Sequence, residues 1–205
     1  MKPKELANEI LEVFEGLCYV LDLEGNILHV GTRRWNSFAD DNSAKDLTAE
    51  YVINKSIFDF ISGDDVRKEI HQVLDELKGG EQSEWIMPYR CDSPDRKRNM
   101  RLSIASIKDD EIITGFIFQS ITLDEEMRPP IDLFDFKAIE NYLAKQRTLP
   151  LLRMCSFCER VRDSNITADN WTEAETYYAK GGSSQVRISH GICGMCREKS
   201  KDGYN

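Results

Sequence analysis

The chain has 205 residues, of which 40% are hydrophobic and 31% charged, and its formal net charge is −9. This length and composition suit a soluble globular protein with one ordinary core and a smaller second module. The acidic balance argues against broad nucleic-acid binding, which needs a positive face that displaces counterions from phosphates. No stretch reaches the roughly 18 apolar residues of a membrane span, and the first residues lack the apolar region of an export signal. We therefore expect a cytoplasmic protein that does not associate with a membrane.

Residues 1–17 are predicted to form an N-terminal amphipathic helix. Ala7 and Leu11 make its apolar stripe wider than one contact surface needs. Such a helix suits contact both with its own domain and with a second copy of the chain. We expect a homodimer formed through this helix and the sheet that follows it. The stripe consists of Leu6, Ile10, Val13, Phe14 and Leu17.

Residues 18–124 alternate between strand and helix signals. Two short apolar runs flank Glu24-Gly-Asn26, which is typical of a hairpin. Ser56–Ile61 indicates a short buried helix, and Asp64–Leu77 a longer amphipathic helix that ends at Gly79-Gly80.

Three further strands are predicted at 83–92, 98–107 and 111–122. The last is apolar on both faces, with Ile112, Phe116 and Phe118 on one and Ile113 and Ile117 on the other. A strand of this kind must be covered on both sides, and we expect the N-terminal helix to cover one of them.

The order of these elements resembles that of PAS sensor domains, as do the segments Asp22-Leu-Glu-Gly-Asn26 and Asp59-Phe-Ile61. The resemblance implies an α+β fold, in which an antiparallel sheet carries flanking helices. It also implies that a small molecule can bind between the sheet and the helices. The sequence leaves the identity of such a ligand unknown.

Haem and flavin are not supported as ligands. A histidine on the long helix binds haem in some PAS domains, and His71 lies on that helix, but it points away from the apolar stripe. His29 alternates with Ile27 and can face either side of its strand. We interpret both histidines as surface or rim residues. The cysteine motif that attaches a flavin is not visible in the helical region. Arg90 and Asp92 are predicted to stabilise a turn, and the alternative is that they contribute polar groups to a pocket mouth.

Residues 125–150 are predicted to be a linker with one helix. Pro129-Pro130 and Pro150 interrupt regular structure, while the segment from Phe134 to Leu143 is compatible with a helix. A linker of this length would let the modules on either side of it move relative to each other.

Residues 151–205 contain two cysteine pairs, Cys155-x-x-Cys158 and Cys193-x-x-Cys196. Each pair places two soft thiolates about one turn apart, so that both can reach one metal ion, and two pairs together are typical of a zinc site. In a reducing compartment metal binding is expected rather than disulfides. An iron–sulfur cluster uses the same ligands and is the alternative to zinc. His190 is a fifth candidate, either as a ligand in a Cys₃His site or as a hydrogen-bond partner of a ligand.

This four-cysteine module is similar to a treble-clef zinc finger, in which a knuckle precedes a second pair that opens a final helix. The arrangement Cys-x-x-Cys…Ser-His-Gly-Ile-Cys-x-x-Cys also resembles a small module attached to bacterial PAS and response-regulator proteins. Four thiolates leave no open coordination position, so we expect a structural metal. Cys18 and Cys91 lie outside the pattern and are predicted to be buried apolar residues.

No catalytic constellation is visible, because the chain has 3 histidines and lacks a Gly-rich phosphate loop, a nucleophile elbow and kinase motifs. We therefore expect no enzyme but a sensory or signal-transduction adaptor. The PAS-like domain would sense a ligand or dimerise, and the zinc module would dock onto a protein signalling partner. The alternatives are a nucleic-acid-binding transcriptional regulator and a thiol–zinc redox switch.

Overall fold

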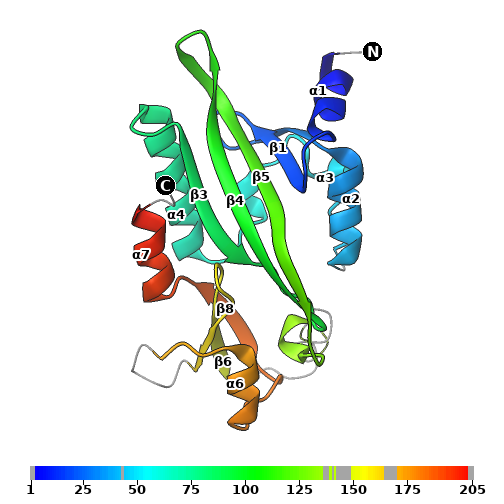
Figure 1. The fold of residues 1–205 in the computed structure, drawn as a ribbon, viewed down its shortest axis with the longest axis vertical. Coiled ribbons are helices and arrows are strands. Elements are labelled where there is room, and N and C mark those ends of the chain that lie inside the picture. The colour runs from blue at the N-terminus through cyan, green and yellow to red at the C-terminus, as the bar shows by residue number, and fades with distance from the viewer. Residues whose placement is uncertain are drawn as a thin grey trace.

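The computed structural model describes residues 3–42, 44–135, 139, 141, 149–163 and 170–202. A 5-stranded sheet with the order β2-β1-β5-β4-β3 forms the larger part of the molecule, and every neighbouring pair in it is antiparallel (Figure 1). Its strands are β1 (Leu17–Leu21), β2 (Ile27–Val30), β3 (Glu84–Arg90), β4 (Arg96–Asp109) and β5 (Ile112–Met127).

Helices connect the two edge strands and cover one face of this sheet. Side chains of α4 and of the sheet form one core, in which Leu21, Leu77, Ile104 and Phe116 are fully buried. The predicted stripe of the long helix is confirmed, because its apolar side chains face this core. No helix in the described part of the chain is long and apolar enough to cross a membrane. The connecting elements are α2 (Thr32–Asp41), α3 (Ala49–Val52), η1 (Ile57–Asp59) and α4 (Asp64–Gly79).

The N-terminal helix is shorter than predicted. α1 spans Pro3–Leu11, and Leu17 already belongs to β1. Between them Gly16 has φ 73°, and a Cβ atom at this position would lie 2.0 Å from the carbonyl oxygen of Ser120. Only glycine fits such a turn, and the helix must end before it so that β1 can pair with β5.

The position of α1 also differs from the prediction. It packs beside β2, where Asn8 Oδ1 lies 3.2 Å from His29 Nδ1. It therefore does not cover the second face of β5, and Ile117 and Ile121 on that face are half-buried. Ile112, predicted to point inward with Phe116, is 71% exposed because it lies at the tip of the β4–β5 hairpin, beyond a register shift at Ile107/Lys108.

A second, 3-stranded sheet with the order β7-β6-β8 lies at one end of the first (Figure 1). The segment after β5 contributes to its core, because Ile131, Leu133 and Phe134 pack against Leu152 and Met154. Part of the predicted linker is therefore a structural part of this module. The helix predicted from Phe134 to Leu143 lies largely outside the described residues. The elements are η2 (Asp132–Phe134), β6 (Leu151–Cys155), β7 (Val161–Asp163), α6 (Ala174–Ala179), β8 (Arg187–Gly191) and α7 (Gly194–Asp202).

Candidate metal centre

Parallel pairing of β6 with β8 brings the two cysteine pairs together. Cys155, the last residue of β6, is paired with Gly191, and Cys193 follows two residues later. The first pair lies in the turn between β6 and β7, and the second pair opens α7. This is the treble-clef-like arrangement expected from the sequence, and it places the four cysteines at one point although they are far apart in the chain.

Backbone N–H groups surround the sulfurs. The Cys193 N–H lies 3.4 Å from Cys155 Sγ, and the Cys196 N–H lies 3.4 Å from Cys193 Sγ. The first turn is closed by a hydrogen bond of 2.9 Å from the Cys155 N–H to the Arg160 carbonyl, and Glu159 in it has φ 55°. Amides directed at sulfur stabilise the thiolate form that a metal requires.

One ligand atom of each cysteine lies within 4.8 Å of the other three, in the group Cys155, Cys158, Cys193 and Cys196. Four thiolates on one zinc ion, with bonds of about 2.3 Å, stand roughly 3.8 Å apart. The Cys158 and Cys193 sulfurs are 3.7 Å apart, which fits this spacing. An iron–sulfur cluster would place iron and sulfide ions between the four thiolates, so the cysteine sulfurs would have to lie further apart.

The thiols influence one another's ionisation strongly. Hydrogen bonds from Cys158 and Cys196 lower the pKa of Cys155 to about 2, and the same contact with Cys155 raises the pKa of Cys158 to about 12. Without a cation, therefore, one thiolate forms easily and its negative charge opposes the others. A divalent cation reverses this effect, because it stabilises all four thiolates together.

His190 is not a member of the four-sulfur group. It lies on β8 opposite Met154 and packs against the N-terminus of α4, where a Cβ atom on Gly63 would be 3.1 Å from the His190 Cβ. Burial lowers the pKa of its imidazole, which favours the neutral form. Its roles as ligand or as hydrogen-bond partner of a ligand stay predictions.

The metal centre packs directly on the PAS-like domain. Cys155, Cys193 and Cys196 belong to the same hydrophobic cluster as Leu77 and Trp85. The Trp85 indole N–H donates to the Ser200 carbonyl of α7 at 3.2 Å, and the Ser200 hydroxyl bonds to Glu69 of α4. The second module therefore contacts the PAS-like domain directly, in addition to the chain segment that joins them.

A buried charge network adds to this contact. Arg90, at the end of β3, bonds both Asp92 and, at 2.5 Å, Glu173 of the second module. Burial alone would lower the pKa of Arg90, but the hydrogen bonds that its guanidinium donates to Asp92 and Glu173 outweigh it and raise the pKa. Arg128 joins the network by pairing with Asp92 at 2.7 Å and with Glu175 at 3.2 Å. The sequence indicated a turn-stabilising role for Arg90 and Asp92, with a place at a pocket mouth as the alternative. It could not indicate these ion pairs, because Glu173 and Arg128 are remote in the chain.

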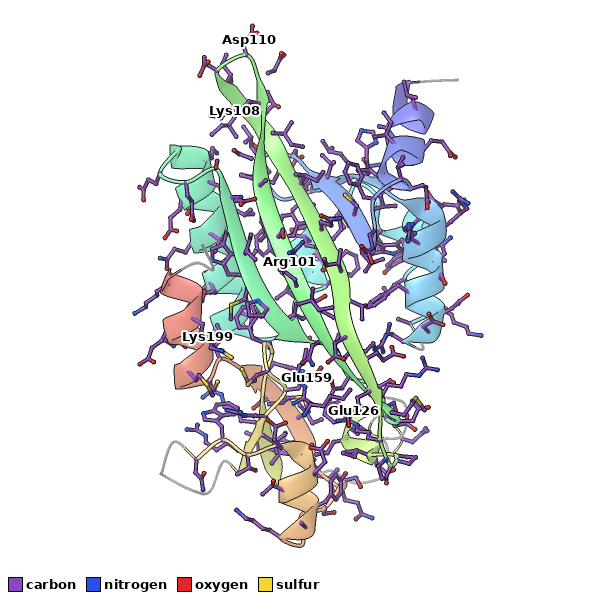
Figure 2. All side chains as sticks on the ribbon, viewed as in Figure 1. Arg101, Lys108, Asp110, Glu126, Glu159 and Lys199 are labelled. Atoms are coloured by element: carbon purple, nitrogen blue, oxygen red, sulfur yellow. The ribbon has the colours of Figure 1, made fainter. Side chains whose placement is uncertain are left out.

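Glu159 also lies at this junction, between the lower end of the large sheet and the second module (Figure 2). Its carboxylate accepts a hydrogen bond of 3.0 Å from the Asp92 N–H. Burial, with the nearby charge of Asp92, raises the pKa of Glu159 to about 8. No pattern in the sequence indicated this burial, which depends on the packing of one module against the other.

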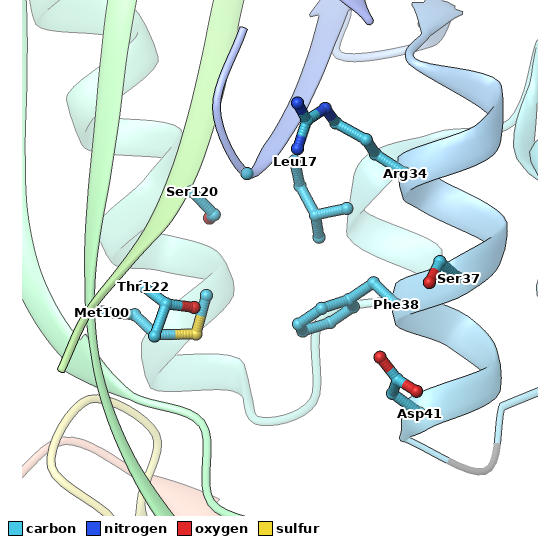
Figure 3. A pocket seen from close by; sticks show the side chains of 9 residues that line it. Leu17, Arg34, Ser37, Phe38, Asp41, Met100, Ser120 and Thr122 are labelled. Atoms are coloured by element: carbon cyan, nitrogen blue, oxygen red, sulfur yellow. The ribbon is translucent and has the colours of Figure 1, made fainter. Parts of the chain in front are cut away.

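Aliphatic side chains fill most of the interior of the PAS-like domain, and aromatic side chains pack against them. Tyr19 stacks on Phe118 with ring centroids 5.0 Å apart and meets Trp35 edge to face at 5.6 Å. A cavity of about 210 Å³ lies between Phe38 of α2 and the sheet residues Met100 and Thr122 (Figure 3). Its volume is below the roughly 300–1,000 Å³ of pockets that hold drug-sized molecules.

Neither histidine proposed for a cofactor lines this cavity. His71 is exposed and stacks on Phe58 with centroids 3.6 Å apart. His29 is paired with Val20 and faces α1, where it contacts Asn8, whereas Ile27 is paired with buried Leu21. A register shift between Val20 and Leu21 separates the two orientations, which alternation in the sequence could not show.

No known protein family matches the chain, and neither does any curated protein sequence. Among solved structures, the PAS domain of Bordetella pertussis BvgS is similar at 16% identity and a TM-score of 0.44, with 69% of this chain and 97% of that chain covered. A sensory box sensor histidine kinase of Vibrio cholerae is 12% identical with a TM-score of 0.40, covering 58% and 90%. VqmA of Vibrio cholerae, a LuxR-type receptor, is 16% identical with a TM-score of 0.43, covering 60% and 52%. These likenesses concern the fold alone. The chain itself has an α+β fold, with an antiparallel sheet in the order β2-β1-β5-β4-β3, and a compact four-cysteine module.

Proposed function

We propose that the protein is a cytoplasmic sensory adaptor without catalytic activity. Its PAS-like domain receives a signal, as a ligand or through dimerisation, and its four-cysteine module docks onto a protein signalling partner. The observation that carries the proposal is the hydrophobic cluster that Cys155, Cys193 and Cys196 share with the PAS-like core. Densely packed interiors transmit displacement, so a change in the sheet reaches the cysteine turns directly.

Partner docking is tested on the exposed first turn of α7. Met195 is 44% exposed there, and Ile112 is 71% exposed at the tip of the β4–β5 hairpin. Met195→Asp should abolish co-purification of the partner by the tagged full chain, while Ile112→Asp should not. Both variants should keep their metal. A chain that remains a lone monomer with neither partner nor ligand would refute the adaptor function.

We propose that the four cysteines bind one zinc ion. The sulfur separations support a single ion, and a closed set of four thiolates is suited to a structural role. Freshly purified protein should contain one zinc ion per chain and show no visible absorbance. Brown protein that contains iron would instead establish the iron–sulfur alternative.

We propose that the protein forms a homodimer through α1 and the open face of the sheet. Ile10 and Val13 are 50% and 79% exposed, and Phe14 is also exposed. Contiguous exposed apolar side chains of this kind mark interaction surfaces. Sedimentation should give a dimer for the native chain and a monomer for Val13→Ser/Phe14→Ser. A native chain that sediments as a monomer at high concentration would contradict this arrangement.

A thiol–zinc redox switch is a second candidate. Cys158 is half-buried, whereas Cys155, Cys193 and Cys196 are buried. An oxidant in solution would therefore react with the Cys158 thiolate first. Peroxide would join the Cys158 and Cys193 sulfurs as a disulfide, be reduced to water and release zinc. Zinc release by stoichiometric peroxide, reversed by a thiol reductant, would support it. Retention of zinc under these conditions would exclude it.

A further inference from the structure

A larger cavity lies where the PAS-like domain, the segment after β5 and the metal module meet. This junction cavity has a volume of about 640 Å³, within the roughly 300–1,000 Å³ of small-molecule pockets. The end of α2 and the loop after it form one wall, and the β3–β4 turn forms another. The rest of the cavity lining comes from Phe134, Asp135 and Glu159. It shares only Phe38 and Asp41 with the smaller cavity of Figure 3, where both side chains are seen on α2.

The polar lining of the junction cavity is acidic. Asp41, Asp46 and Asp135 contribute exposed carboxylates, and no lysine or arginine is among the described residues that line it. Asp92 also lies in the wall, but Arg90 and Arg128 neutralise it from behind. The structure gives the exposed carboxylates of Asp41 and Asp46 no ion-pair partner within the described residues. Negative charge in a concave site of reduced dielectric attracts a cation more strongly than the same charge on a flat surface.

Part of the lining is apolar. Phe38 and Leu47 lie on the side of the PAS-like domain, and Pro94 and Phe134 lie on the side of the turn and the connecting segment. A metal ion would leave these surfaces in contact with water. An amphipathic molecule covers them and places its charge near the carboxylates, which is the usual composition of a small-molecule site.

We propose that the junction cavity binds a small organic cation. Its ammonium group would face Asp41 and Asp46, and its aromatic or aliphatic body would pack against Phe38, Leu47 and Pro94. The site lies outside the interior of the PAS-like domain and includes Glu159 of the metal module, so the bound cation touches both parts of the molecule. This inference extends the proposed function, which names no ligand, and it does not depend on a signalling partner.

Three probes of one shape test it on the metal-loaded full chain: 2-phenylethylammonium, neutral 2-phenylethanol and anionic 3-phenylpropanoate. In amide NMR spectra the ammonium compound should shift Ala44, Asp46 and Ser93 in a saturable manner. The alcohol should bind at least about tenfold more weakly and the carboxylate not at all, because only the cation gains the attraction of the carboxylates.

Matched variants define the site. Asp46→Asn should weaken the ammonium compound about three- to fivefold, and Asp41→Asn/Asp46→Asn should weaken it further. Asp40→Asn, at an exposed position of α2 that does not line the cavity, should leave its affinity unchanged. Equal affinity for all three probes, an equal response to Mg²⁺, or no saturable shift up to about 10 mM would overturn the proposal.

Discussion

The PAS-like domain and the metal module are stabilised in different ways. The domain buries long side chains from distant parts of the chain, and Leu21, Ile104 and Phe116 have no exposed surface. The module has strands of 3 to 5 residues and α-helices of 6 and 9 residues around a smaller core. Elements this short rarely stabilise themselves, and small modules commonly depend on a metal. The comparison indicates that hydrophobic burial suffices for one region, whereas the other needs its metal and the surface of its neighbour.

Removal of the metal should have the largest effect and should separate the two regions. Structural zinc contributes on the order of 10 kcal/mol in small modules, so Cys193→Ser or chelation should unfold 151–202. In hydrogen exchange, amides of β6 and β8 should lose protection while those of β4 and β5 keep it. Cys18→Ala serves as the control, because Cys18 is buried in β1 away from the four sulfurs. Simultaneous loss of protection in both sheets would show that the domain also depends on the metal.

A cavity in the core of the PAS-like domain should have the next largest effect. Phe116 is fully buried, and Phe116→Ala should lower the free energy of unfolding by about 3–5 kcal/mol. Urea denaturation followed by tryptophan fluorescence measures this loss. Ile112→Ala, at a position 71% exposed on the same strand, should change it by less than about 0.5 kcal/mol. Equal losses would contradict the burial pattern of β5.

The junction between the two regions should show a smaller effect. Arg90→Met leaves the buried Asp92 carboxylate with Arg128 as its one remaining ion-pair partner in the described chain, which should cost about 2–4 kcal/mol. A double-mutant cycle with Glu173→Gln should give a coupling energy of about 1–3 kcal/mol. The exposed pair Arg96–Glu125, 2.8 Å apart, is the control and should contribute less than about 1 kcal/mol. Zero coupling between Arg90 and Glu173 would mean that this ion pair does not join the modules.

The smallest perturbation is chemical labelling, which changes no residue. Burial raises the pKa of Cys18 to about 11 and that of Cys91 to about 12. A raised pKa reduces the thiolate fraction at pH 8, so Cys18 should be alkylated roughly 100-fold more slowly than an ordinary thiol. After chelation Cys158 should react much sooner than either. Mass spectrometry of tryptic peptides would report the order, and prompt labelling of Cys18 would contradict its burial.

Local signals in the sequence predicted the elements better than their contacts. The stripe of α4 and the spacing of the cysteines each depend on neighbouring residues, and both appear in the structure as predicted. The position of α1, the orientation of His29 and the burial of Glu159 depend on partners remote in the chain. No periodicity within one segment encodes such partners, so these features could not be predicted.

The sequence by itself determined an α+β chain with a PAS-like order of elements and four cysteines that can hold one metal ion. Apolar periodicity and ligand spacing are properties of short segments, and they persist whatever the rest of the chain does. Only the tertiary structure decided that the cysteines share a core with the sheet, that Arg90 pairs with Glu173, and that an acidic cavity lies between the two regions. These features arise because burial drives the two modules together, and the groups that then meet are fixed by shape and charge in three dimensions.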